Sequence, residues 1–345
     1  MKKVLVIGDT HFDNPYPGYL GAQLGTLVKI VKSSKPQAVI FLGDIFHHRN
    51  PDPEVLVETA RMFRSIEHDV EKIVILRGNH DSASKADDGL TVLELLQSDT
   101  VHVVRKAEEH TWGLNFIAHF EDEKRVSMVL KEIDKGMIFG HFGYEGCINA
   151  GGYFDFHLKK EEFKVPTILG HIHEFKQEGN ITILGTPWST NFGECDYRHY
   201  VGELEYDIRK QTWSELKKIE VNYGVRHYVC PYHSLETMKE EIMDPNYFTV
   251  LRVLLDKFSD DTTNDLRTKI KEEYKVGYVD LKFQPILNKK LNNRLSDYAP
   301  TTNIDSLSEE VIEKYLDEQT STLPKEVLKA GLEEIKLHED KEDNG

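Results

Sequence analysis

Short motifs that combine glycine with aspartate, asparagine and histidine recur through the first half of the chain. They read Gly-Asp-Thr-His at 8–11, Gly-Asp-Ile-Phe-His at 43–47, Gly-Asn-His-Asp at 78–81, Gly-His-Phe at 140–142 and Gly-His-Ile-His at 170–173. Hard oxygen and imidazole donors without any thiolate suit Mn²⁺ or another divalent ion that tolerates octahedral geometry better than they suit a structural zinc ion. Together the motifs supply ligands for two adjacent metal ions, a common device for splitting a phosphate ester with water.

Taken singly, these motifs have ordinary structural interpretations. A lone Gly-Asp-x-His is more often a turn whose aspartate caps a helix, and a lone Gly-His-x-His is an equally weak signal. Gly-Asn-His-Asp is stronger, because a strand that runs into these three polar residues has little structural reason to exist. All five motifs occur here, each behind an apolar run. The joint pattern therefore predicts a metallophosphoesterase.

Apolar runs of the buried-strand type must position these motifs. The runs with this pattern are Val4–Gly8, Ala38–Gly43, Ile73–Leu76 and Met137–Gly140. Later strands at Ile181–Leu184 and Tyr200–Tyr206 indicate a second sheet packed on the first. Motifs at the carboxyl ends of such strands converge on one cleft.

Amphipathic helices are expected between the strands. One carries an apolar stripe at helical spacing, formed by Leu20, Leu24, Leu27, Val28 and Val31. A second begins at Pro53 and buries Leu56, Ala60, Phe63 and Ile66. A third is expected around Leu90–Leu96. The predicted fold class is α/β, a four-layer α/β/β/α sandwich.

The whole chain is expected to divide into four parts. Residues 1–220 are expected to form the phosphoesterase domain, and residues 221–300 a small α+β capping domain. The capping domain would contain strands at His227–Cys230 and Tyr247–Leu254 and a helix at Thr263–Tyr274. Residues 301–337 are expected to form two helices, and residues 338–345 a disordered acidic tail.

The two C-terminal helices have recognisable signals. Ser306 and Glu309 form a capping box, and Pro324 starts the second helix, whose apolar stripe is Val327, Leu328, Gly331, Leu332 and Ile335. These stripes pack either on the body of the chain or on a partner protein. The sequence alone leaves both alternatives open.

Composition limits the class of protein. The chain has 345 residues and three widely separated cysteines, a spacing that fits neither a zinc site nor a disulfide framework and is compatible with the reducing cytoplasm. We expect no signal peptide and no membrane span. The formal charge of −16 opposes binding to nucleic acid. However, residues 305–345 hold thirteen acidic residues against five lysines, so this segment contributes half of that charge.

The order of the motifs resembles the calcineurin-like metallophosphoesterases, and within them the SbcD family, including its phage members. SbcD is the nuclease subunit of the SbcCD complex. Three features favour this family: His47 after Gly-Asp-Ile-Phe, Asp81 at the end of the third motif, and the turn Gly-Thr-Pro-Trp-Ser at 185–189. One departure is Phe12-Asp13, where the family more often has Leu-Gly, which puts the DNA contacts of this loop in doubt.

This resemblance implies a ligand set and catalytic residues. One metal ion would be bound by Asp9, His11, Asp44 and His173, and the other by Asp44, Asn79, His141 and His171. Asp44 would bridge the ions, with two Mn²⁺ as the expected cofactors and Mg²⁺ as a weaker substitute. His80 would protonate or stabilise the leaving oxygen, and Asp81 would orient its imidazole. His47 either contacts the phosphate, directly or through water, or caps the next helix.

The resemblance also implies a substrate and partners. The protein would be a DNA exonuclease and endonuclease that acts in DNA recombination, repair and replication. It would form a homodimer through its nuclease domain and act in the cytoplasm of the cell or, if phage-encoded, of the host. The chain has no Gly-rich loop ending in Gly-Lys-Ser/Thr, so an SbcC-type ATPase would supply ATP hydrolysis. A basic patch free of carboxylates either contacts DNA phosphates or is merely solvated, and consists of Lys282, Lys289, Lys290 and Arg294.

Two other functions are compatible with the motifs. A phosphatase or cyclic-nucleotide phosphodiesterase would use the same metal centre on small substrates. A non-catalytic scaffold would keep the fold only to bind partners, although the intact ligand set argues against it. The histidines outside the motifs, including His48, His119 and His157, are expected to be surface or packing residues.

Overall fold

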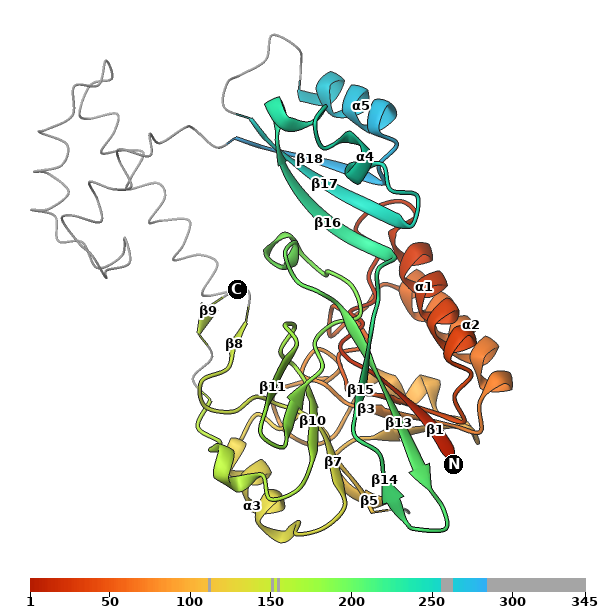
Figure 1. Ribbon diagram of the computed structural model, residues 1–345, viewed down its shortest axis with the longest axis vertical. Coiled ribbons are helices and arrows are strands. Elements are labelled where there is room, and N and C mark those ends of the chain that lie inside the picture. The colour runs from red at the N-terminus through yellow and green to blue at the C-terminus, as the bar shows by residue number, and fades with distance from the viewer. Residues whose placement is uncertain (111–112, 150–151, 154–155, 256–262, 284–345) are drawn as a thin grey trace, which may run out of the picture. The chain divides into compact units, whose positions relative to one another are not determined.

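The computed structural model describes residues 1–110, 113–149, 152–153, 156–255 and 263–283 (Figure 1). Residues 1–283 form one compact unit. The predicted helix pair at 301–337 and the tail at 338–345 lie outside the described residues, as do Lys289, Lys290 and Arg294 of the predicted basic patch. Within the described residues, no helix combines the length and apolar character needed to cross a membrane.

The first sheet has seven strands in the order β14-β13-β1-β2-β3-β4, with β15 also paired to β13. Strands β1 to β4 are parallel, and β13 runs antiparallel to β1. The strands are β1 (Lys2–Ile7), β2 (Ala38–Phe41), β3 (Lys72–Leu76), β4 (Val101–Val104), β13 (Tyr200–Asp207), β14 (Thr212–Trp213) and β15 (Lys217–Glu220).

The second sheet has six strands in the order β11-β12-β10-β7-β6-β5. Its four inner strands are parallel, and each edge strand is antiparallel to its neighbour. They are β5 (Ala107–His110), β6 (Leu114–Ile117), β7 (Met137–His141), β10 (Thr167–Gly170), β11 (Lys176–Glu178) and β12 (Ile181–Ile183). A separate two-stranded sheet consists of β8 (Ile148–Asn149) and β9 (Gly152–Tyr153).

Alternating side chains of the strands create the layers. In β1, Val4 and Val6 point into a core shared by the two sheets, whereas Leu5 and Ile7 face helices α1 (Tyr19–Ser34) and α2 (Pro53–Ile66). The outer face of the second sheet packs on α3 (Glu123–Glu132). The helices α1 and α2 lie together along one side of the molecule in Figure 1. The predicted four-layer α/β/β/α sandwich is confirmed.

Two predicted elements differ in the structure. The expected third helix is a 3₁₀ helix, η2 (Val92–Leu96), because the Thr91 hydroxyl caps its start and the chain leaves it at Gln97, so only one short turn forms. The strand predicted at Tyr200–Tyr206 belongs to the first sheet, not the second, since it pairs with β1. The other 3₁₀ helices are η1 (Glu67–Asp69), η3 (Lys160–Glu162), η4 (Phe192–Glu194) and η5 (Tyr232–Ser234).

A three-stranded parallel sheet follows the sandwich. It contains β16 (Gly224–Pro231), β17 (Tyr247–Leu255) and β18 (Tyr278–Phe283), with helices α4 (Lys239–Ile242) and α5 (Thr263–Tyr274). These elements bury an apolar core of their own. The sheet also contacts the sandwich, because Val225 and Val250 join the core beneath α1, and the rings of Tyr16 and Tyr278 stack 3.8 Å apart. The predicted domain boundary after residue 220 stays a prediction.

Candidate metal centre

The polar residues of the five motifs lie where parallel strands end. Asp9 follows β1, Asp44 follows β2 and Asn79 follows β3, while His141 is the last residue of β7 and His171 follows β10. The carboxyl ends of the two sheets therefore deliver these side chains to one place, as open α/β sheets commonly do for their ligands.

The glycines of the motifs leave the space that the polar side chains need. A Cβ atom on Gly78 would overlap the carboxylate of Asp44, and one on Gly170 would overlap the carboxylate of Asp9. Each of these glycines thus makes room for a side chain from a different motif.

Three of the predicted ligands have an unusual backbone conformation. His11, Asp44 and His171 have φ values of 44°, 48° and 79°, in the left-handed region that favours glycine. Such residues cost about 1–3 kcal/mol each and persist where surrounding contacts fix them. Here the amide of His11 donates to the carbonyl of Asp44 (2.9 Å), which ties the first two motifs together.

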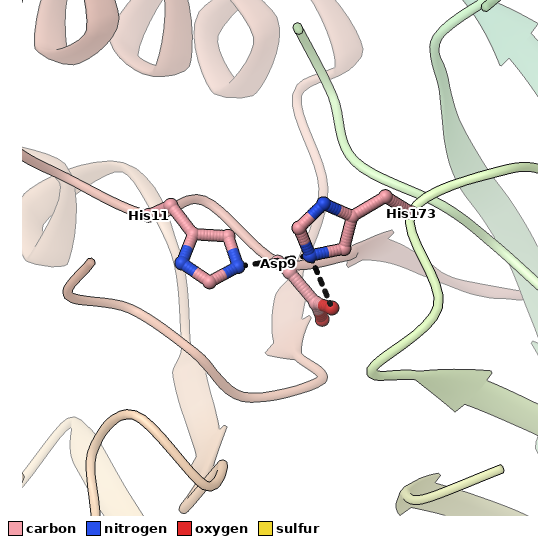
Figure 2. A group of neighbouring side chains, drawn as sticks. All are labelled: Asp9, His11 and His173. Atoms are coloured by element: carbon pink, nitrogen blue, oxygen red, sulfur yellow. Dashed lines mark hydrogen bonds and ion pairs between the residues drawn. The ribbon is translucent and has the colours of Figure 1, made fainter. Parts of the chain in front are cut away.

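One group of donor atoms is formed by Asp9, His11 and His173 (Figure 2). Their nearest atoms are the two Nε2 atoms of His11 and His173, which lie 3.1 Å apart. The Nε2 atom of His173 is also 3.9 Å from Oδ2 of Asp9. Two imidazole nitrogens this close either share a proton or face a common cation.

A second group contains Asp44, His141 and His171, with Asn79 among them. The Oδ1 atom of Asn79 lies 3.0 Å from Nε2 of His141 and 2.9 Å from Nδ1 of His171. The other ring nitrogen of His141, Nδ1, donates to the carbonyl of Leu42 (2.8 Å). Because Nδ1 carries that proton, Nε2 of the neutral ring presents a lone pair to the group.

Asp44 lies between the two groups. Its Oδ1 is 3.4 Å from Nε2 of His141, and its Oδ2 is 3.7 Å from Nε2 of His11. In addition, Oδ1 of Asp9 and Nδ1 of His11 are buried without a hydrogen-bond partner. This donor set and its unsatisfied Asp9 oxygen fit a pair of divalent ions with Asp44 shared between them. The assignment of each ligand to an ion stays a prediction.

Burial and mutual charge shift the protonation of these groups in the metal-free protein. Burial, together with the nearby Asp44, raises the pKa of Asp9 to about 7. Burial opposes the charge on Asp44 as well, but His141, His11 and His80 hold its pKa well below the usual range. The pKa of His141 is raised to about 9, because Asp44 and Asp9 outweigh its burial.

Glu194 is a site residue that the sequence analysis missed. It is fully buried, and its Oε1 accepts a hydrogen bond from Nδ1 of His173 at 2.6 Å. The amide of Thr190 donates to its other oxygen (2.7 Å). Burial disfavours charge on both partners, yet their contact raises the pKa of His173 and lowers that of Glu194. A carboxylate of this kind fixes the ring and leaves Nε2 toward the site. No motif marks Glu194 in the sequence.

The predicted role of Asp81 needs correction. Its carboxylate accepts hydrogen bonds from the amides of Ile45 (3.0 Å), Phe46 (3.2 Å) and Gly78 (3.0 Å), so it holds the loop that carries Asp44. Instead of Asp81, the carbonyl of His47 accepts from Nδ1 of His80 (2.5 Å). Because the Asp81 carboxylate accepts hydrogen bonds from these three backbone amides, it does not orient the ring of His80, the residue before it in the sequence.

His80 lies beside the first group without belonging to it. Its ring centroid is 5.0 Å from that of His11, and its amide donates to Oδ1 of Asp44 (2.8 Å). Because a carbonyl can only accept, Nδ1 of His80 carries a proton, which leaves Nε2 for proton transfer. His47 lies next to it, with ring centroids 5.9 Å apart.

A groove of about 830 Å³ opens beside Asn79 and His171. Its lining includes Phe156, whose ring is 5.5 Å from that of His171. His119 also lines it, and its ring stacks on His171 at 5.8 Å. His119 thus adjoins the candidate centre, and burial lowers its pKa to about 4. In the sequence, His119 follows the apolar run of β6, as the motif residues follow their strands, although no glycine precedes it. That position could have marked it as a site residue.

Three other residues named in the sequence analysis are exposed to solvent. Lys282 is exposed on β18, within the three-stranded sheet. His48 is also exposed and lies next to His47, with ring centroids 4.7 Å apart. His157 is exposed and hydrogen bonds with Glu123.

Comparisons with known proteins identify a family. The family model described as calcineurin-like phosphoesterase matches residues 2–175, half of the chain. Among curated proteins, no sequence matches. Among solved structures, the chain is similar to a nuclease, MPE, from Pseudomonas putida, with 19% identity and a TM-score of 0.29. That similarity covers 50% of this chain and 62% of the length of the P. putida protein.

Binding of Mn²⁺ at pH 7 should release about one to two protons. His141, with a pKa of about 9, carries a second ring proton, on Nε2, at this pH, and Asp9, with a pKa of about 7, is half protonated. Protons therefore compete with the ion, so affinity should rise with pH and level off above about pH 9. Calorimetry in buffers of different ionisation enthalpy measures the release. Binding heats that do not depend on the buffer would contradict this assignment.

Substitution of Glu194 should weaken metal binding although Glu194 is not a predicted ligand. In Glu194→Gln, the charge that stabilises the His173 ring is lost, and Mn²⁺ affinity should fall about 10- to 100-fold. Glu174→Gln, which changes an exposed carboxylate next to His173 in sequence, is the matched control. Equal Mn²⁺ affinity in the two variants would show that Glu194 merely fills space.

Proposed function

The chain belongs to the calcineurin-like phosphoesterase family, and on that premise we propose that it is a Mn²⁺-dependent DNA exonuclease and endonuclease that processes DNA ends with an SbcC-type ATPase. The family implies metal-dependent hydrolysis of phosphoesters. The narrower proposal adds the substrate, the preferred ion and the partner.

The placement of Asp44 between two groups of donor atoms is the observation that carries the hydrolytic part of the proposal. When bound, two divalent ions supply Lewis acidity toward the phosphate and lower the pKa of water. The chain contributes rigid placement of the ligands: Asp81 holds the Asp44 loop, and Glu194 holds the ring of His173. Four of the seven ligands are imidazoles, which favours Mn²⁺ over Mg²⁺.

His80 is the residue that we assign to proton transfer. Its backbone is fixed by Asp44 and its ring by the carbonyl of His47, so the free Nε2 is held beside the metal groups. When Nε2 also carries a proton, the ring can deliver that proton to the oxygen that leaves phosphorus and return to its neutral form with Nδ1 still bonded to the carbonyl of His47. This role uses a ring whose nitrogens are not needed to bind the ions.

The choice of DNA as substrate is supported by the sequence and by the groove. The turn at 185–189, which resembles that of the SbcD family, is anchored in the apolar core: Trp188 is buried, and its indole donates to the carbonyl of Thr10 (3.1 Å). The groove beside Asn79 and His171 has a volume within the range of ligand pockets, about 300–1,000 Å³. Its partly exposed Phe156 offers a ring on which a base can stack.

The partner proposal depends on residues 301–337. Their apolar stripe at Val327, Leu328, Leu332 and Ile335 suits docking of a helix into a groove of an ATPase subunit. The resemblance further supports a homodimer through the nuclease domain. Three free cysteines, Cys147, Cys195 and Cys230, are compatible with the cytoplasm as the place of action.

Hydrolysis of a small phosphodiester is the second candidate function. The groove has four acidic lining residues, Glu121, Asp122, Glu123 and Glu162, against three basic ones, Arg49, Lys85 and Lys124. This small excess of carboxylates disfavours a long polyanion. These carboxylates would repel a single small ester less than they would repel a DNA strand.

DNA cleavage by the purified chain tests the proposal. We expect linear and circular single-stranded DNA to be degraded in Mn²⁺, far more slowly in Mg²⁺, and not at all after chelation, because Mg²⁺ demands stricter octahedral geometry. Asp44→Asn should abolish cleavage, since it removes a charge shared by both groups. Hydrolysis of bis(p-nitrophenyl) phosphate without cleavage of DNA would instead establish the second candidate.

Substitution of His80 separates binding from turnover. His80→Ala should lower turnover roughly 10²- to 10⁴-fold, the usual contribution of a general acid, while Mn²⁺ affinity stays unchanged. His68→Ala, an exposed histidine outside the site, is the control. Loss of Mn²⁺ binding in His80→Ala would make His80 a ligand and overturn its assignment.

Truncation tests the partner proposal. A chain that ends at Pro300 should keep Mn²⁺-dependent cleavage of single-stranded DNA, because every predicted ligand precedes residue 174. It should no longer co-purify with an SbcC-type ATPase or degrade duplex DNA in response to ATP. A lower melting temperature with intact association would show that the segment packs on the chain itself.

A further inference from the structure

A third group of donor atoms lies beside the two already described. It consists of one carboxylate and two imidazoles, from Asp13, His47 and His48, whose donor atoms all lie within 4.8 Å of one another. The Oδ2 atom of Asp13 is 3.8 Å from Nε2 of His48. The mechanism proposed above does not use Asp13 or His48.

Backbone hydrogen bonds fix the two segments that carry this group. The amide of Phe12 donates to the carbonyl of Ile45 (2.8 Å), and the amide of His47 donates to the carbonyl of Phe12 (3.2 Å). Phe12 and Phe46, which form an isolated parallel bridge, are both fully buried. The main chain, rather than the chance position of long surface side chains, therefore brings Asp13 next to His47 and His48.

Asp13 is fixed from a second direction by α1. Its amide donates to the side-chain oxygen of Gln23 (3.1 Å), and the Gln23 side-chain nitrogen donates to the carbonyl of His11 (3.1 Å). Gln23 is fully buried. The loop from His11 to Asp13 thus has a defined conformation, which a small-ion site requires.

Without a neighbouring cation, the negative charge of Asp13 is unfavourable at this position. A carboxylate near a centre that receives phosphate esters repels the substrate. Within the described part of the chain, no lysine or arginine pairs with it, and Arg49 pairs with Glu121 instead. The Asp13 carboxylate instead accepts a hydrogen bond from the amide of Asn14 (2.9 Å) and lies beside the ring of His48. A cation at this point would neutralise the carboxylate and offer positive charge to a phosphate.

We propose that Asp13, His47 and His48 bind a third divalent cation beside the candidate metal centre. Two imidazoles and one carboxylate select a first-row transition ion such as Mn²⁺, Co²⁺ or Zn²⁺ over Mg²⁺ or Ca²⁺. Water completes the coordination, because the His48 side chain is 63% exposed. With three protein ligands and this exposure, the site fills after the two deeper ones. Asp13 stands where the resembling family more often has glycine, so the site is a feature of this chain.

Counting bound ions tests the proposal independently of any activity. Metal-free full-length protein is titrated with Mn²⁺, and the free ion is followed by electron paramagnetic resonance. We expect three ions per chain in the unaltered protein and two in both Asp13→Ala and His48→Ala. His68→Ala, which removes an exposed histidine elsewhere, should still bind three.

Two results would overturn the proposal: two ions in the unaltered protein, or a third ion that persists in both Asp13→Ala and His48→Ala. If Asp13→Ala disturbs the loop and empties the deeper sites as well, His48→Ala decides, since that exposed ring can be removed without altering the core. Melting temperatures of the metal-free variants check that each one folds. Anomalous scattering from Mn²⁺ in crystals then places the third ion.

Discussion

Seven side chains bring their lone pairs into one small, mostly buried volume, and much of the structure serves that requirement. The Nε2 atoms of His11 and His173 lie 3.1 Å apart, and the carboxylate of Asp44 meets both groups of donors. Without cations, such a cluster must take up protons, which explains the raised pKa values of Asp9 and His141. Divalent ions, when bound, would replace those protons and relieve the repulsion among the donors.

The two-sheet fold meets this requirement with rigid elements. Parallel strands from both sheets end at the candidate centre, so that most of the predicted ligands are no more than a few residues from a strand. The sheets share one apolar core, which fixes their strand ends relative to each other. This rigidity allows His11, Asp44 and His171 to keep left-handed backbone conformations that a looser loop would relax. Asp81 and Glu194 then hold a loop and a ring in place through buried hydrogen bonds.

Prediction from sequence worked where local pattern and global fold agree. Apolar runs followed by polar motifs identified the strands, and helical spacing identified α1 and α2, because burial on one face imposes these periods. Partners distant in the sequence could not be read in this way. Glu194 reaches His173 through a 3₁₀ turn without a motif, and β13 joins the first sheet because of tertiary pairing. Asp81 was assigned to its neighbour His80, but its hydrogen bonds go to backbone amides around Asp44.

Hydrolysis by this protein, as proposed, depends on the sharing of Asp44 by two metal ions, and the third cation would occupy a separate, weaker site. Anomalous diffraction from crystals of the full chain grown in Mn²⁺ can locate each ion relative to Asp44. We expect two strong peaks on either side of the Asp44 carboxylate, about 3.5–4 Å apart. A single peak, or two peaks of which only one contacts Asp44, would contradict it.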